Sequence, residues 1–221
     1  MRVPGAFAEA VAVREKNLHL LPDRLSFDEA SLAEPLAVCI HSVKLGLQRT
    51  GSEKISALVL GGGAIGILCT MILDQFGVHH VEIAETNALR RKTLAEVTPA
   101  RPYDPAQDRP KGPVDLVLDC VGSGITRKTA SEMAKPGGTI VHIGLQDNLE
   151  GLDTRRITLQ EIAFLGTYCY TNQDFSDAID LLANAKISRQ GWSEIRSLSE
   201  GGAGFLDIHN GKAAAKIILE I

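Results

Sequence analysis

The sequence predicts an α/β fold built on a doubly wound parallel sheet, and three observations lead to this class. Five short apolar runs have the length and composition of buried strands. Helical segments lie between them, an arrangement typical of parallel strands that are covered on both faces. A glycine-rich turn joins the first strand to the helix that follows it. The length of 221 residues is enough to bury a sizeable core.

Composition excludes several classes of protein. The apolar fraction of 44% and the charged fraction of 23% are ordinary for a globular chain. A net charge of −4 gives no electrostatic footprint for nucleic acid, so we expect no nucleic-acid partner. Four cysteines lie far apart with no CxxC pair, which is typical of reduced thiols in a cytoplasmic protein and argues against a cysteine-paired structural zinc site.

The sequence predicts neither a signal peptide nor a membrane-spanning helix. The N-terminal residues MRVPGAFAEAVAV lack the apolar core of a signal peptide. An uncharged run from Ile55 to Leu73 has the length of a membrane span, but it contains Gly61, Gly62 and Gly63. The flanking pattern predicts a buried strand, a turn and a helix there.

The first part of the chain predicts irregular structure and then two helices. Residues 1–25 alternate weakly and favour short strands and turns. Ser26, with Glu29 three residues later, forms a capping box for a helix that begins near Phe27 and meets Pro35. A second helix is expected from Leu36 to Leu45, with Gly46 as its C-cap.

Strands and helices alternate after Gly46. Residues 99–113 hold five of the nine prolines and predict a loop with at most a very short strand. The expected strands are 57–60, 81–84, 114–119, 139–143 and 162–167, and the expected helices are 64–76, 88–97 and 126–134. An i, i+3, i+4, i+7 stripe predicts one more helix around residues 175–182, and a terminal strand is expected at 217–219.

The strongest motif is Gly61-Gly62-Gly63-Ala64-Ile65-Gly66, which follows a strand and opens a helix. Gly61 permits the tight turn, Gly63 lets a pyrophosphate approach the backbone, and Gly66 lets the helix pack closely against the strand. The helix N-terminus would bind the phosphates. A packed turn without a ligand is the alternative interpretation, and the complete strand–turn–helix context favours dinucleotide binding.

Glu85 ends the next strand, where an acid accepts hydrogen bonds from the ribose 2′-OH. Its charge repels a 2′-phosphate, so the sequence favours NAD over NADP. Arg90 follows five residues later and is placed to contact the adenosine ribose. The ends of later strands, at Cys120-Val121-Gly122 and Gly144-Leu145, are expected to border the same crevice.

Further stretches add a more specific pattern: GAFAEAVAV, LPDRLSFDEASLAEPLAVCIHSV, LVLGGGAIG, VDLVLDCVG, KPGGTIVHIGL and GKAAAKIILEI. Together they run almost end to end. With them the chain resembles the zinc-type medium-chain alcohol and polyol dehydrogenases, of the sorbitol and threonine dehydrogenase kind. The resemblance implies a Rossmann domain at residues 41–171, flanked by remnants of a GroES-like catalytic domain at 1–40 and a returning C-terminal segment at 172–221.

The resemblance also implies roles for individual residues. Those expected to bind NAD are Gly61, Gly63, Ala64, Ile65, Gly66, Glu85, Arg90, Val121, Ile143, Leu145 and Lys216. Tyr170 and Val38 would border the substrate pocket, and Glu34 would lie beside the position of the catalytic zinc. Taken without the resemblance, Lys216 is an exposed lysine on an edge strand and Glu34 is a helix-end acid.

The large lobe that supplies the zinc ligands in such enzymes has no counterpart in this sequence. The chain therefore resembles the C-terminal two-thirds of an NAD-dependent dehydrogenase that moves a hydride between a secondary alcohol or polyol and NAD. We expect no complete metal site and no turnover by the chain alone. The alternatives are a non-catalytic dinucleotide-binding or interaction module and a zinc-free quinone or enoyl reductase, and Glu34-Pro35 argues against the second. A homo-oligomer is expected through the sheet edge near Ile162–Thr167.

Overall fold

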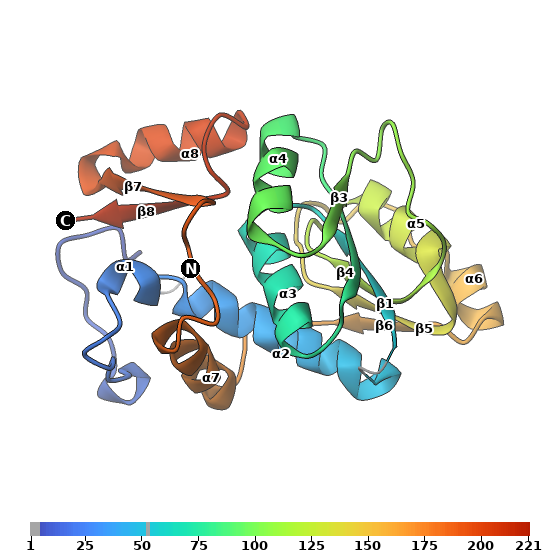
Figure 1. The fold of residues 1–221 in the computed structure, drawn as a ribbon, viewed down its shortest axis with the longest axis horizontal. Coiled ribbons are helices and arrows are strands. Elements are labelled where there is room, and N and C mark those ends of the chain that lie inside the picture. Colours follow the sequence, from blue (N-terminus) through green and yellow to red (C-terminus); the bar gives the residue numbers. More distant parts are fainter. Residues whose placement is uncertain (1–4, 52–53) are drawn as a thin grey trace.

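A computed structural model describes residues 5–51 and 54–221, and its centre is a six-stranded parallel sheet (Figure 1). The strand order is β3-β2-β1-β4-β5-β6. The strands are β1 (Ser56–Leu60), β2 (His80–Ala84), β3 (Arg101–Tyr103), β4 (Val114–Asp119), β5 (Ala134–His142) and β6 (Ala163–Gly166). The chain starts in the middle, winds outward to β3, then crosses β1 to β4 and winds outward to β6. This reversal makes the predicted doubly wound sheet.

Helices cover both faces of the sheet, as the uninterrupted apolar strands require. The helices α2 (Ala33–Thr50), α3 (Ala64–Gln75) and α4 (Ala88–Val97) share one core with Val59, Leu116 and Leu118. On the other face, α5 (Gly124–Met133) and α6 (Thr154–Leu159) pack with Leu58 and Val117. Successive strand residues thus enter opposite cores, because side chains alternate along a strand.

The predicted break between two helices at Pro35 and the C-cap at Gly46 were wrong. The first helix, α1 (Phe27–Ala30), is capped by Ser26 as expected, but α2 begins at Ala33 and runs to Thr50. Pro35 lies in the first turn of α2, where its missing N–H costs no hydrogen bond. Gly46 is buried in the middle of α2, and a Cβ there would lie 2.8 Å from Leu116 Cδ1. The glycine allows the helix to lie close to the sheet.

Two other expectations need correction. Residues 5–25 contain a short 3-10 helix at Glu15–Asn17 and no strand, while residues 1–4 of that expected segment lie outside the described part of the chain. The helix expected to end at Ala134 ends at Met133, and β5 already begins at Ala134. The Pro136-Gly137-Gly138 segment lies within β5 because the ladder with β4 shifts its register there.

The C-terminal elements form a separate layer beside the sheet. Helix α7 (Asn172–Ala183) packs against α2, and β7 (Ser193–Ser197) pairs in parallel with β8 (Lys216–Glu220). Helix α8 (Gly201–His209) crosses over this pair (Figure 1). The predicted terminal strand is confirmed. Its partner β7, with the sequence SEIRS, carries no apolar run that would have revealed it.

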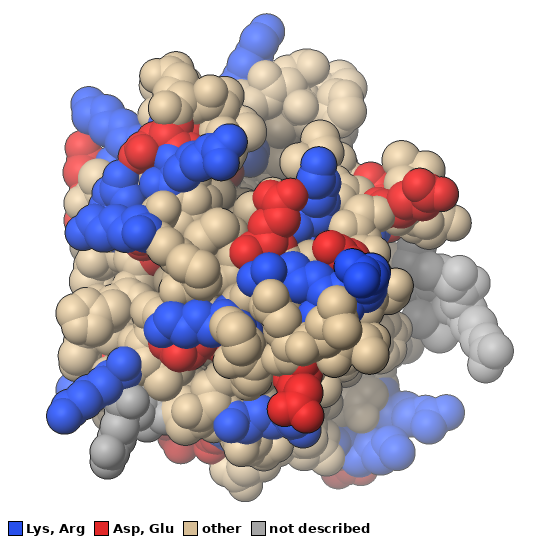
Figure 2. Space-filling view, turned by 90° about the vertical axis from the view of Figure 1, so that its right-hand side faces the viewer, with Lys and Arg blue, Asp and Glu red and all other residues tan. Residues whose placement is uncertain are grey.

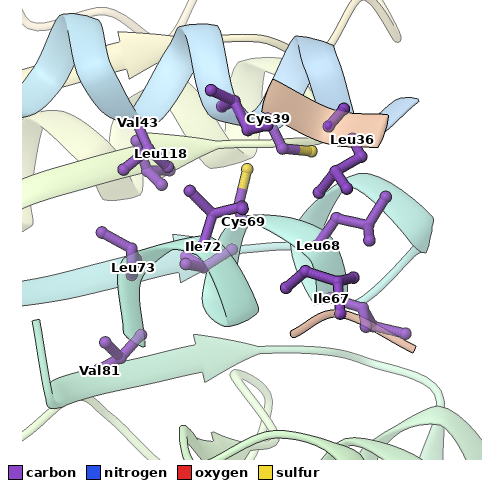
Figure 3. Close-up of a cluster of buried hydrophobic side chains, with 14 of the residues drawn as sticks. Leu36, Cys39, Val43, Ile67, Leu68, Cys69, Ile72, Leu73, Val81 and Leu118 are labelled. Atoms are coloured by element: carbon purple, nitrogen blue, oxygen red, sulfur yellow. The ribbon is translucent and has the colours of Figure 1, made fainter. Parts of the chain in front are cut away.

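The apolar run from Ile55 to Leu73 divides into β1, the glycine turn and α3, as predicted. The stretch Phe27–Thr50 passes a length and composition test for a membrane span, yet 56% of its most apolar window is buried inside the protein. Figure 3 shows the reason: Leu36, Cys39 and Val43 of α2 point into the core against α3. A core helix of this kind satisfies the same test.

Charges of both signs lie interspersed on the face that Figure 2 shows, without a field of one sign. The four cysteines are free thiols, two of them buried, and Figure 3 places the sulfurs of Cys39 and Cys69 between α2 and α3. The Cys39 thiol donates a hydrogen bond to the Ile65 carbonyl at 3.4 Å. Burial raises the pKa of this thiol, so it packs as a small neutral side chain.

Candidate functional site

A cavity of about 600 Å³ lies at the carboxyl ends of the central strands. This is the edge at which open α/β sheets bind ligands, and β1 and β4 flank the point where the winding reverses. Its size falls in the range of ligand-binding clefts. The lining includes eight of the residues predicted to bind the cofactor: Gly61, Gly63, Ala64, Ile65, Gly66, Glu85, Arg90 and Val121.

The glycine turn after β1 is held in one shape by the backbone around it. Gly61 has φ of 96°, and its N–H donates to the Ala84 carbonyl at 2.9 Å. A Cβ at Gly66 would lie 1.8 Å from the Gly61 carbonyl oxygen, so the helix touches the turn at this point. A Cβ at Gly63 would meet nothing within 4 Å. Packing thus requires glycine at 66, whereas position 63 has open space beside it.

The turn leads directly into the N-terminus of α3. Gly63 is its N-cap and no side chain caps the helix. Ala64, Ile65 and Gly66 form the first turn and line the cavity. Their N–H groups are among those that lack an intrahelical acceptor. With the helix dipole they favour an anion at this place.

Glu85 lies at the end of β2 and is 7% exposed. Its carboxylate turns back toward the glycine turn: Oε2 accepts the Gly62 N–H at 2.8 Å and Oε1 accepts the Asn87 N–H at 2.7 Å. Oε1 also accepts the Thr86 hydroxyl at 3.4 Å, whereas Oε2 can accept a further hydrogen bond. The acid therefore fixes the turn that it faces and keeps acceptor capacity toward the cavity.

Two arginines follow Glu85, and they make different contacts. Arg90 lines the cavity, and its Nε is buried without a hydrogen-bond partner in the described part of the chain. Arg91 donates to the carbonyls of Glu85 and Thr86 at 2.8 and 2.7 Å and pairs with Asp104 at 3.0 Å. Arg91 thus holds the turn between β2 and α4, while Arg90 has donor capacity left for a ligand.

The opposite wall of the cavity comes from the end of β4. Asp119 is fully buried and accepts the N–H groups of Val121 and Gly122 at 3.1 and 2.8 Å. Gly122 has φ of 73°, and a Cβ there would lie 1.9 Å from the Gly144 carbonyl oxygen. The ends of β4 and β5 therefore meet backbone to backbone, and Val121 is held at the cavity wall.

Other lining residues carry no motif that would have singled them out as ligand-binding. They include Tyr103, Ser123, Thr126, Thr129 and Gln146. Burial and the nearby Glu82 carboxylate raise the pKa of Tyr103 to about 12, so its phenol stays protonated. Cys120, at the strand end expected to border the crevice, also lines the cavity. Contact with Cys69 and burial raise the pKa of its thiol, which keeps it neutral.

The structure places the remaining predicted residues away from this cavity wall. Ile143 packs against the core, and Leu145 is 83% exposed on the loop after β5. Lys216 begins β8 and borders a different cavity, beside Phe7 and Ile217. The resemblance aligned these positions by sequence, whereas the described fold holds β8 in its own small sheet.

Glu34, Val38 and Tyr170 form a separate neighbourhood at the start of α2. Glu34 and Val38 lie one helical turn apart, and burial together with the Glu34 carboxylate raises the pKa of Tyr170. Within residues 5–51 and 54–221, no three His, Cys, Asp or Glu side chains are grouped to hold a metal ion. A catalytic zinc needs about three protein ligands. The described residues therefore do not fit a zinc ion.

Many protein families contain a doubly wound parallel sheet, and comparison with known families shows to which of them this chain belongs. The sequence model of the zinc-binding dehydrogenase family matches residues 64–184, more than half of the chain. The chain belongs to the zinc-binding dehydrogenase family. The matched segment runs from the first turn of α3 to the end of α7, and it contains Glu85 and Arg90.

The relatives that the chain matches are longer than the chain itself. A Saccharomyces cerevisiae protein named as a probable (R)-acetoin-forming diacetyl reductase is 31% identical over 197 residues, which cover 83% of this chain and 46% of that protein. Sorbitol dehydrogenase 1 of the same yeast is 27% identical, covering 84% of this chain and 56% of the relative. The chain thus spans about half the length of these relatives.

A solved structure shows the same fold. A Sinorhizobium meliloti protein described as a zinc-binding dehydrogenase, bound to NADP, superposes with a TM-score of 0.82 at 29% identity. The match covers 96% of this chain and 64% of that protein. The predicted Rossmann-type sheet and the predicted family are therefore confirmed.

Proposed function

We propose that this chain is the cofactor-binding part of an NAD-dependent oxidoreductase that transfers a hydride between a secondary alcohol or polyol and NAD. One observation carries the proposal: the uncapped N-terminus of α3 opens into a 600 Å³ cavity behind Gly63, where a Cβ would meet no other atom. A pyrophosphate needs both the unpaired N–H groups and the free approach to the backbone. Family membership and the names of the relatives support the alcohol and polyol class.

NAD, when bound, supplies the hydride acceptor or donor at its nicotinamide ring. The chain supplies position and surroundings. The first-turn N–H groups of α3 would hold the pyrophosphate, and Glu85 and Arg90 would hold the adenosine ribose over β2. Val121 would support the nicotinamide half over β4, with Ile143 and Leu145 nearby at the end of β5. Lys216, Tyr170 and Val38 remain proposed contacts of the complete protein with cofactor and substrate.

We propose NAD rather than NADP because Glu85 places a carboxylate where the ribose 2′-oxygen would lie. A 2′-phosphate there would meet a buried negative charge that backbone N–H groups hold in place. Arg90 offers a compensating charge from one side only. The relative solved with NADP makes this preference a point to test rather than a family property.

The described residues provide too few metal ligands for zinc-dependent chemistry by the isolated chain. Glu34 is the only residue of the predicted zinc neighbourhood that could ligate a zinc ion, and the described residues offer no set of three ligands. We therefore expect no zinc-dependent alcohol oxidation by the chain on its own. Measuring NADH formation with sorbitol and 2,3-butanediol, with and without zinc, tests this. A zinc-dependent rate would contradict it.

Three further proposals concern the setting of the protein. The chain divides into residues 1–40, 41–171 and 172–221, although α2 runs continuously through the first boundary. It forms a homo-oligomer through the free edge of β6. It resides in the cytoplasm, which its free cysteine thiols support, since such thiols persist in a reducing compartment.

Calorimetric titration of the folded chain with NADH and with NADPH tests the cofactor proposal. We expect NADH to bind at least about tenfold more tightly, equivalent to about 1.4 kcal/mol. The variant Glu85→Gln removes the charge and should narrow the preference to about threefold. It also leaves one of two N–H groups without its acceptor, so thermal melting must accompany the titration. A folded chain that binds neither nucleotide would overturn the cofactor proposal and favour a non-catalytic interaction module.

A further inference from the structure

A loop beside the nucleotide cavity lacks apolar anchors. This segment, residues 144–151, follows β5 and is called the β5 loop below; its Gln146 lines the cavity. Its larger apolar side chains point outward, with Leu145 83% and Leu149 69% exposed. Hydrophobic burial therefore does little to hold the loop. Hydrogen bonds must determine its position.

Most of the side-chain hydrogen bonds to the β5 loop come from Arg127 of α5, which is only 8% exposed. Its Nη1 donates to the carbonyls of Gly122 and Asp147 at 3.0 and 3.1 Å. Its Nη2 donates to Asp147 Oδ1 at 2.6 Å and to the carbonyls of Leu149 and Glu150. One planar guanidinium thus joins the end of β4 to three residues of the loop, Asp147, Leu149 and Glu150.

Asp147 is the side chain of the loop that takes part in this contact, and we call the contact of Arg127 with Asp147 and the surrounding backbone the junction. Its Oδ1 accepts the Leu149 N–H at 3.0 Å and its Oδ2 accepts the Gly124 N–H at 3.3 Å. The Arg127 guanidinium lowers the pKa of the Asp147 carboxyl, so the pair stays ionised near neutral pH. A backbone hydrogen bond also joins the loop to the end of β4, because the Gln146 N–H donates to the Val121 carbonyl at 3.2 Å.

The junction lies on one side of the glycine turn. β2, with Glu85, is on one side of β1, and β4 and β5 are on the other. A dinucleotide whose pyrophosphate sits at the turn would lay one nucleoside half over each side. The segments that Arg127 joins, at Gly122 and at residues 147–150, follow β4 and β5 and therefore lie on the side of β1 away from β2. Their neighbours Val121 and Gln146 line the cavity.

We propose that Arg127 is a positioning residue: it holds the β5 loop and the Val121–Gly122 turn in register, and so shapes the part of the cavity that receives the nicotinamide half of the cofactor. The inference rests on the proposed dinucleotide function. Arg127 belongs to no nucleotide-binding motif. We expect it to affect the binding of the nicotinamide half of the ligand and not that of the adenosine half.

The test compares NADH with AMP, which carries only the adenosine half. In the variant R127A we expect the dissociation constant for NADH to rise about tenfold and that for AMP to stay within about twofold. The matched control is K128A, which removes the neighbouring positive charge of α5. Lys128 is exposed, and among the described residues its one ion pair is with Glu132, at 4.0 Å. K128A should leave both constants unchanged. A merely structural role would weaken NADH and AMP equally.

A second variant keeps the proposal testable where R127A fails to fold. R127K retains the charge but cannot reach the separate acceptors of a planar fork, so we expect an intermediate loss for NADH, about threefold, with AMP unchanged. Equal losses for both ligands, or no loss for NADH in folded R127A and R127K, would overturn the role of Arg127. Failure of the wild-type chain to bind either NADH or AMP would instead overturn the proposed function.

Discussion

Gly61, Gly63 and Gly66 belong to one motif, yet each position needs glycine for a different physical reason. Gly61 needs it for a left-handed φ of 96°. Gly66 needs it because the neighbouring carbonyl oxygen occupies the space of a Cβ at 1.8 Å. Gly63 has an ordinary φ of −74° and open space around it. The described fold does not require glycine at position 63, and we propose that the pyrophosphate does.

This difference predicts opposite outcomes for two alanine variants. Gly66→Ala should lower the free energy of unfolding by about 3 kcal/mol, because backbone must move to admit the methyl group. Gly63→Ala should cost less than about 1 kcal/mol of stability, yet weaken NADH binding more than tenfold. Denaturant titration and calorimetry measure the two quantities. Unchanged NADH affinity in Gly63→Ala would contradict the placement of the pyrophosphate.

At the scale of elements, α2 is joined to α7 by a cluster around Asp174. This side chain is 3% exposed, and its carboxylate contacts His41 Nδ1 at 3.0 Å and Lys44 Nζ at 2.9 Å. It also completes the capping box of α7 with Thr171. Burial alone would raise the pKa of Asp174, but hydrogen bonds from Thr171 and Lys44 outweigh it and lower this pKa to about 2.

The lowered pKa predicts how stability depends on pH. Because the native pKa lies below the unfolded value of about 3.9, ionised Asp174 contributes about 2 kcal/mol above pH 5. This contribution disappears as the pH falls from about 4 to 2. The variant Asp174→Asn lacks it at every pH. The difference in unfolding free energy between wild type and variant should therefore be largest at pH 6 and shrink toward pH 2, as followed by denaturant titration at each pH.

The control for this measurement is Asp180→Asn on the same helix, since no ion pair of Asp180 is found among the described residues. Asp180→Asn should track wild type at all pH values. A difference for Asp174→Asn that stays constant from pH 6 to pH 2 would show that its ionisation does not join the two helices.

At the scale of the whole molecule, β6 leaves one edge of the six-stranded sheet unpaired within the described chain. The Thr167 N–H donates inward to the His142 carbonyl. Backbone groups alternate along a strand, so the Gly166 N–H points away from β5. Exposed edges of this kind pair readily with a second copy. Tyr168, 84% exposed, continues the same edge.

We therefore predict a dimer in solution at tens of micromolar, measured by light scattering over a dilution series. Gly166→Pro removes an outward N–H without touching the β5 ladder, and a Cβ at this position meets nothing within 4 Å. The variant should be monomeric and retain the wild-type melting temperature within a few degrees. A wild-type chain that is monomeric throughout the series would contradict the proposed oligomer.

Local sequence determined much of this protein. The apolar runs of β1, β2, β4 and β5, the cap at Ser26 and the glycine turn were predicted from neighbours a few residues apart, because strand burial, capping and φ > 0 are local requirements. Glu85 and Arg90 were predicted from their position at the end of the strand that follows this turn. Together with Val121 at the end of β4, these features place eight predicted residues around one cavity.

Tertiary structure alone decided the rest. Gly46 looked like a helix end, but it is a contact point between α2 and Leu116. Arg127 has no local sequence signal of burial, yet it is buried because the β5 loop, 20 residues later, folds over it. β7 has no apolar run and exists because β8 offers it a partner. Each depends on atoms distant in sequence, and a local pattern holds no information about which distant backbone will supply them.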